Sequence, residues 1–173
     1  MPKLNRLWYV LHTKSRFENV VNEGLVKKSL ESFLPKIKVK SRRRDRNLMI
    51  QVPLFPGYLF VKTDLHPQEH LEIVKTVGAV RLLGSKDGPL PVDHATIESL
   101  KIMVSSGNPI TTGNSFSKGD RVLVVYGPFA GVTGIFVRYR GKNRVVVNVE
   151  ALGQSAQVDV NEDDIELLPE ILS

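Results

Sequence analysis

The spacing of apolar residues changes several times along the first third of the chain. Residues 7–11 form a short aromatic and β-branched run, which predicts a first strand. Apolar residues then recur at intervals of three and four, which predicts a helix that ends near Ser32. Ser15 and Glu18 have the spacing of a capping box, in which each side chain bonds a free backbone N–H at the helix start. The pattern therefore predicts a strand followed by an N-capped helix.

From Phe33 onward the apolar period becomes two. Ile37 and Val39 alternate with lysines, so one face of the predicted strand is apolar and the other is cationic. Residues 41–47 are too charged to be buried and predict a hairpin tip before the chain returns over 48–52. Two prolines and a glycine then interrupt the ladder, and a further strand is expected over residues 58–62.

Further elements follow in an α+β order. A short helix is expected around residues 71–74, strand pieces over 79–83 and 90–92, and a third helix after Asp93, which is a good N-cap. The pattern predicts an antiparallel sheet flanked by helices over residues 1–106.

The last third of the chain has no helical period. Residues 107–117 are rich in Gly, Ser and Thr and are expected to form a flexible linker. Four short strands separated by glycine-containing turns are then expected between residues 118 and 173: 122–126, 134–139, 144–149 and 154–160. So many short strands predict a small all-β barrel.

Composition narrows the function classes. The chain has 173 residues and no cysteine, which excludes thiol nucleophiles, iron–sulfur clusters and Cys-ligated zinc. No apolar run is long enough to span a bilayer, so we expect a cytoplasmic protein without membrane partners. The four histidines lack metal-ligand spacing, and no phosphate loop or nucleophile elbow is present. We therefore expect a non-enzymatic protein without a cofactor or metal.

Charge is distributed unevenly along the chain. Residues 1–110 carry 18 Lys/Arg and 10 Asp/Glu, whereas residues 111–173 carry 6 and 8. Seven cations and one acid lie between Lys36 and Arg46. The candidate nucleic-acid contacts in this run are Lys38, Lys40, Arg42, Arg43, Arg44 and Arg46. Such a run is often only a solvated surface, but it would also provide several phosphate contacts, and we favour upstream or non-template DNA as its partner.

Two motifs resemble those of the NusG family of transcription elongation factors. Residues 53–61, Pro-Leu-Phe-Pro-Gly-Tyr-Leu-Phe-Val, resemble the Phe-Pro-Gly-Tyr signature of the NusG N-terminal (NGN) domain. Residues 119–122 and 127–134 are similar to the KOW motif of a C-terminal SH3-like barrel. The order of the motifs and the intervening linker match as well. Residues 134–147 further resemble antiterminators found with polysaccharide operons, of which RfaH is a distant cousin.

The resemblance implies contacts with RNA polymerase. In this family the N-terminal domain binds the clamp helices of the largest subunit through a hydrophobic patch. The matching positions here are Phe55, Tyr58, Phe60 and Leu83. We expect at least one of Tyr58 and Phe60 to be an exposed anchor, although Phe60 and Leu83 could instead be core residues.

The resemblance implies three further contacts. Lys14 and Arg16 match positions that RfaH-like proteins use for the displaced DNA strand. His70 is the candidate contact with the polymerase gate loop, but the other residues of that motif differ here. Phe129 lies in the loop with which NusG meets Rho or a small-subunit ribosomal protein, and it could equally be a barrel-closing aromatic.

These observations lead to one expected function and its alternatives. We expect a monomeric antitermination factor that suppresses pausing at selected operons. The alternatives are a general NusG factor that supports Rho-dependent termination and transcription–translation coupling, and a ribosomal or RNA-binding KOW protein. The glycines and the Val145–Val147 run are poor helix material, so the barrel is expected not to refold into helices.

Overall fold

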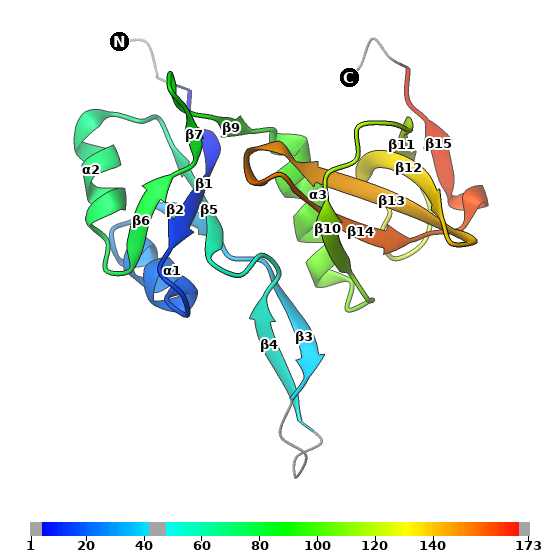
Figure 1. Cartoon of the computed structure of the whole chain (residues 1–173), viewed down its shortest axis with the longest axis horizontal. Coiled ribbons are helices and arrows are strands. Elements are labelled where there is room, and N and C mark those ends of the chain that lie inside the picture. The colour runs from blue at the N-terminus through cyan, green and yellow to red at the C-terminus, as the bar shows by residue number, and fades with distance from the viewer. Residues whose placement is uncertain (1–4, 42–47, 170–173) are drawn as a thin grey trace. The chain divides into compact units, whose positions relative to one another are not determined.

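The computed structural model describes residues 5–41 and 48–169, which fall into two compact units (Figure 1). The units are Met1–Asp93 and His94–Ser173. The first unit contains the helices α1 (Glu18–Lys27) and α2 (Pro67–Lys75). Its strands are β1 (Leu7–Thr13), β2 (Glu31–Phe33), β3 (Lys36–Lys40), β4 (Met49–Pro53), β5 (Tyr58–Thr63), β6 (Ala79–Leu82), β7 (Gly84–Ser85), β8 (Gly88–Pro89) and β9 (Pro91–Val92).

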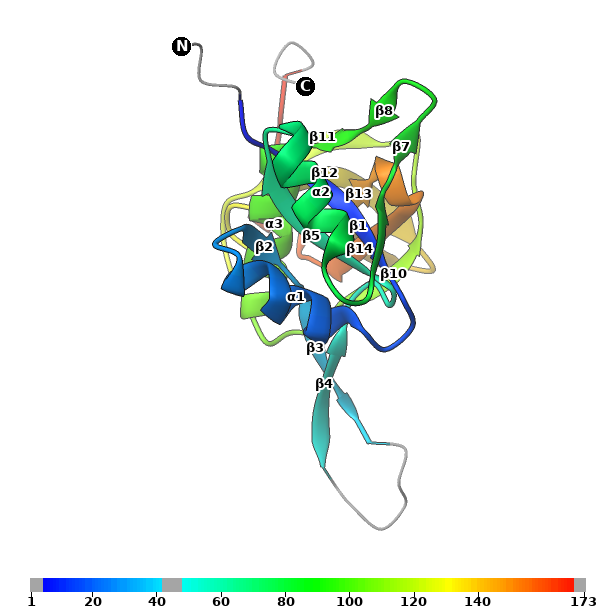
Figure 2. The same ribbon diagram turned by 90° about the vertical axis from the view of Figure 1, so that its left-hand side faces the viewer.

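The central sheet of the first unit is antiparallel and has the strand order β2-β5-β1-β6, with β9 also pairing with β1. Both helices lie on the same side of this sheet (Figure 2). Tyr9 and Leu11 of β1 and Leu59 and Val61 of β5 form the core on that side, together with buried residues of the helices. Because side chains alternate along a strand, the even-numbered residues of β1 and β5 face the opposite side.

The expected capping box does not form. Phe17 occupies the N-cap position of α1 and makes no side-chain cap bond. Arg16 has a φ of 66°, so the chain turns just before the helix, and Glu18 becomes its first residue. The helix ends at Lys27, earlier than expected, because the chain turns again at Ser29 with a φ of 62° and enters β2.

Strands β3 and β4 form a separate two-stranded antiparallel hairpin that projects from the first unit (Figures 1 and 2). Its register pairs Val39 with Ile50 and Lys38 with Gln51. The expected alternation is confirmed, because one face of the hairpin is apolar and the other carries the lysines of β3. The hairpin tip at residues 42–47 lies outside the described residues.

The second unit is built on a six-stranded antiparallel sheet with the order β10-β14-β13-β12-β11-β15. Its elements are α3 (His94–Ser105), β10 (Thr111–Asn114), β11 (Asp120–Val124), β12 (Thr133–Tyr139), β13 (Lys142–Val149), η1 (Glu150–Leu152), β14 (Gln154–Asp159), η2 (Glu162–Asp164) and β15 (Ile165–Leu167). The four expected strands are present. An α+β sheet unit followed by a small, mostly β unit confirms the expected fold class.

The observed division of the chain differs from the expected boundaries. Helix α3, expected in the N-terminal domain, packs on β12 and β13 of the second unit. Buried Ser99 of α3 accepts the Thr133 N–H at 3.0 Å. Residues 111–114 of the expected linker form β10 and pair with β14, because backbone pairing overrides the flexible composition of this segment.

Candidate binding surfaces

The first candidate surface is the side of the central sheet that faces away from α1 and α2. Its side chains, which we call the aromatic face, are Trp8, Val10, His12, Phe33, Phe55, Tyr58 and Phe60. The ring of Tyr58 stacks on that of His12, with 5.0 Å between the centroids. The ring of Phe60 lies 6.0 Å from Phe33 and 6.4 Å from Phe55. The aromatic face therefore contains two groups of packed rings, His12 with Tyr58 and Phe60 with Phe33 and Phe55.

Exposure differs among the four expected clamp residues. Tyr58 and Leu83 are half-buried, whereas Phe55 and Phe60 are each 1% exposed. Phe60 is therefore a core residue, which was the alternative left open for it, and Phe55 is buried as well, whereas Tyr58 keeps part of its side chain exposed. Truncating a buried phenylalanine costs about 3–5 kcal/mol, so Phe60→Ala would test folding more than binding. The role of these residues in polymerase binding stays a prediction.

A tight turn sets the position of Tyr58. Phe55 accepts the Tyr58 N–H at 3.0 Å, with Pro56 and Gly57 between them and a Gly57 φ of 87°. This is the arrangement of a type II β-turn, which favours proline at its second position and glycine at its third.

Both backbone groups of Gly57 are bound by other elements of the first unit. The Gly57 C=O accepts the Thr13 N–H at 2.8 Å, and its N–H donates to the Glu18 carboxylate at 3.1 Å. Glu18 is only 6% exposed, so this bond is shielded from water. Sequence reasoning missed this role of Glu18 and the stacking role of His12. The alternation Trp8, Val10, His12 was the available signal for His12.

The second candidate surface is the cationic face of the β3–β4 hairpin. Lys38 and Lys40 are exposed on this face. The other expected cations of the run, Arg42, Arg43, Arg44 and Arg46, lie outside the described residues. Lys14 and Arg16 are exposed in the segment between β1 and α1. A cationic two-stranded ribbon of this kind can follow a phosphate backbone.

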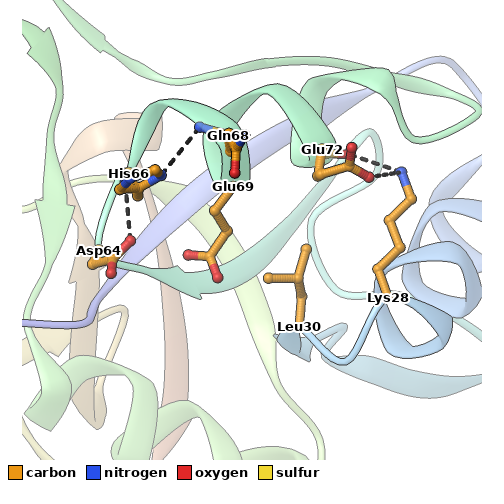
Figure 3. Close-up of a pocket in the computed structure, with 7 residues that line it drawn as sticks. All are labelled: Lys28, Leu30, Asp64, His66, Gln68, Glu69 and Glu72. Atoms are coloured by element: carbon orange, nitrogen blue, oxygen red, sulfur yellow. Dashed lines mark hydrogen bonds and ion pairs between the residues drawn. The ribbon is translucent and has the colours of Figure 1, made fainter.

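A polar cavity of about 380 Å³ lies beside α2 in the first unit (Figure 3). Its lining includes Lys28, whose ammonium group lies 3.6 Å from the Glu72 carboxylate. At the start of α2 the Asp64 carboxylate accepts the His66 N–H at 2.9 Å. This bond, helped by the nearby Arg6 guanidinium, lowers the pKa of Asp64 below its usual value. The lining carboxylates are thus already paired, Glu72 with Lys28, and Asp64 and Glu69 with Arg6.

His70 lies in the middle of α2 and is half-buried. Its N–H donates to the His66 C=O at 2.8 Å, which is an ordinary helical bond. The structure therefore positions His70 as part of α2. A contact between this histidine and the polymerase stays a prediction.

In the second unit Phe129 is 6% exposed and lines a cavity of about 250 Å³. Tyr126, which is 74% exposed, and Pro128 border the same cavity. Asp159 and Asp164 add carboxylates to its rim. The ring of Phe129 is therefore nearly buried and borders a hollow, and its contact with a partner stays a prediction.

No group of three His, Asp or Glu side chains within 5–41 and 48–169 is placed to hold a metal ion. Over the same ranges no helix is both long and apolar enough to cross a membrane.

These features define a two-part protein in which an α+β unit with an aromatic sheet face precedes a small unit built on one antiparallel sheet, with α3 packed on that sheet. A family model described as "Transcription termination factor nusG" matches residues 6–101, which is more than half of the chain. The chain belongs to the NusG family of transcription termination/antitermination factors. The matched segment spans the first unit and continues into α3.

Curated relatives match over nearly the whole chain. The transcription termination/antitermination protein NusG of Thermus thermophilus is 28% identical over 175 residues, which cover 89% of this chain and 94% of the relative. NusG of Borreliella burgdorferi is 26% identical over 183 residues, covering 94% and 99%. The solved structure titled "Domain interaction in Thermotoga maritima NusG" has a TM-score of 0.53 at 22% identity, covers 95% of this chain and 98% of its own, and supports the fold alone.

Proposed function

We propose that this protein binds RNA polymerase through the aromatic face of its first unit and suppresses pausing and termination during elongation. The observation that carries the proposal is the family match over residues 6–101, the segment that contains the Phe-Pro-Gly-Tyr turn and the aromatic face. The proposed polymerase element is the pair of clamp helices of the largest subunit. A few desolvated aromatic anchors can supply most of the affinity of such an interface.

Tyr58 is the central anchor in this proposal. Its ring is half-buried, stacks on His12 and follows a turn that fixes the start of β5. Leu83 is also half-buried and donates its N–H to the Val10 C=O at 2.9 Å, so it extends the same sheet. Phe55 and Phe60 are each 1% exposed, so Tyr58 and Leu83 are the two of these four residues that are available for contact.

Such a factor changes the behaviour of polymerase only if it binds one polymerase conformation more tightly than another. A factor that binds the closed, elongating clamp more tightly than the paused clamp shifts the population toward elongation. Lys14, Arg16 and the cationic hairpin would add contacts to upstream or non-template DNA. These phosphate contacts would weaken as the salt concentration rises.

The second unit is proposed to recruit another partner through the cavity that Phe129 borders. Rho or a small-subunit ribosomal protein would fit the general alternative, in which the chain supports termination and translation coupling. We propose the specialised role at selected operons, in keeping with the resemblance of residues 134–147. The curated relatives are named for both termination and antitermination, so the two roles need a direct test.

Polymerase binding can be tested with Tyr58→Ala in the full chain. Loss of a hot-spot side chain is worth about 2 kcal/mol or more, so the dissociation constant for core RNA polymerase should rise about thirtyfold. Tyr58→Phe should bind like the parent, because it keeps the ring. Val77→Ala is the matched control, since Val77 is 70% exposed and is not a residue of the aromatic face. An affinity for Tyr58→Ala within twofold of the parent would refute the role of this face.

A transcription assay separates the specialised and general roles. The protein is added to polymerase on a template with a pause and a terminator, with and without Rho. The proposal expects shorter pauses and more readthrough, and it expects Tyr58→Ala to lose both effects. Increased termination that depends on Rho would instead identify the general role.

A further inference from the structure

The hairpin that joins β12 to β13 concentrates the positive charge of the second unit. Residues 111–173 contain six Lys/Arg against eight Asp/Glu, so this part of the chain is acidic overall. Four of the six cations nevertheless lie between residues 138 and 144, which we call the Tyr139 hairpin: Arg138, Arg140, Lys142 and Arg144. A local cationic patch on an otherwise acidic unit can attract phosphate groups.

Tyr139 is the last residue of β12, next to the turn of this hairpin, and is 42% exposed. The guanidinium carbons of Arg140 and Arg144 lie 5.2 and 5.3 Å from the centroid of its ring, within the range of cation–π contacts. Arg144 is held in place, because it donates to Asp159 at 3.0 Å and to Gln157 at 3.2 Å. An aromatic ring and two guanidinium planes are therefore presented together at a fixed place.

Arg140 is distinct from the other cations of the hairpin. Arg138 pairs with Glu162 at 3.1 Å and Lys142 with Asp159 at 3.7 Å, whereas Arg140 has no ion pair among the described residues. Its φ of 51° and the φ of 78° at Gly141 form the kind of tight turn in which asparagine or glycine is the usual first residue. An arginine at this position is not explained by the turn itself.

We propose that the Tyr139 hairpin binds single-stranded nucleic acid. Aromatic rings and arginine planes stack on unpaired bases, while neighbouring cations follow the phosphates, and this combination is typical of single-strand binding. A duplex keeps its base faces stacked inside, whereas a single strand of RNA or DNA exposes them. An acidic protein partner would use the cations but gains little from an exposed ring. The proposal does not depend on polymerase binding through the first unit.

The experiment measures binding of a labelled single-stranded RNA of about 12 nucleotides by fluorescence anisotropy, a length within the usual site size of small β-barrels. The parent for this test is the full chain with Arg42, Arg43 and Arg44 changed to Gln, which reduces phosphate binding by the β3–β4 hairpin. Tyr139→Ala should weaken binding about fivefold to hundredfold, the range that stacking of one base on an aromatic ring gives. Tyr139→Phe should restore the parent affinity.

Two further variants control for charge and folding. Arg140→Asn suits the turn and should also weaken RNA binding severalfold, with an unchanged circular dichroism spectrum. Tyr126→Ala removes another exposed tyrosine of the same unit, 74% exposed, and should leave RNA binding unchanged.

Three outcomes would overturn the proposal. The first is that Tyr139→Ala binds the RNA with an affinity within twofold of the parent, even if Arg140→Asn binds weakly. The site would then recognise charge alone, which is what an acidic protein partner would require. Another is an equal loss on Tyr126→Ala. The third is a duplex DNA of the same length that competes as well as unlabelled single-stranded RNA.

Discussion

Replacing Glu18 with alanine is expected to destabilise the first unit by about 2–4 kcal/mol. The Glu18 carboxylate is buried and accepts the Gly57 N–H at 3.1 Å. A hydrogen bond to a charged group contributes about 1.5–3 kcal/mol. Burial of a methylene group adds about 0.8 kcal/mol. Alanine keeps the Cβ carbon, so the substitution removes one buried methylene group, Cγ. The sum places the effect well above that of an ordinary surface substitution.

The chain provides its own probe for this measurement. Its one tryptophan, Trp8, lies buried in β1 of the first unit. Fluorescence of Trp8 during urea unfolding therefore reports on the unit that contains Glu18. Glu18→Gln keeps an oxygen acceptor and should lose only about 1 kcal/mol, the difference between a charged and a neutral hydrogen bond.

Glu23→Ala is the matched control, because Glu23 is exposed on the same helix. A change at such a site should stay within about 0.5 kcal/mol. If Glu18→Ala and Glu23→Ala lose the same stability, the carboxylate does not hold the Pro-Gly turn. A loss for Glu18→Ala without a loss of polymerase affinity, measured below the unfolding transition, would mean that the turn is not needed to position Tyr58.

Three further predictions concern stability. Gly134→Ala would place a Cβ against the Val146 carbonyl oxygen and should cost about 1–3 kcal/mol in thermal unfolding followed by circular dichroism; a change below about 0.5 kcal/mol would show that the strands adjust around the added methyl group. Ser99→Ala leaves the Thr133 N–H without its acceptor and should cost about 1–3 kcal/mol in the same assay. A change below about 0.5 kcal/mol would mean that water replaces the serine hydroxyl as the acceptor. The pKa of Asp64 is lowered in the folded protein, so its ionised form stabilises the fold at pH values above the unfolded-state pKa of about 3.9, and this stabilisation is lost as the pH falls through the folded-state pKa. Asp64→Asn should therefore make the free energy of unfolding depend less on pH in the acid range. An unchanged dependence on acid pH would contradict the stabilising role of the ionised Asp64 carboxylate.

Periodicity predicted most of the fold because the buried faces are regular. The period-two run at Ile37 and Val39 predicted β3 and its two faces, and the glycine-separated strands predicted the second unit. Helix ends were less predictable. Left-handed residues at Arg16 and Ser29 shift both ends of α1, and neither arginine nor serine signals this conformation in a sequence.

The candidate sites depended on contacts between distant segments, which sequence patterns do not contain. Tyr58 was found from its motif, but the stacking of His12 depends on the register of β1 against β5. The burial of Phe60 has the same cause, since its ring packs between Phe33 of β2 and Phe55 of the turn. Local patterns therefore identified the residues, while the sheet pairing decided their exposure.

The Phe-Pro-Gly-Tyr turn links these observations, because it sets the register of β5. Gly57 is bound through its C=O to Thr13 and through its N–H to Glu18, so the first residue of β5 has one available position. Side chains alternate along a strand, and a slip of one residue would turn Tyr58 and Phe60 toward the helices. Leu59 and Val61 would then leave the core beneath α1 and α2. The physical role of the motif is therefore to assign each residue of β5 to its side of the sheet.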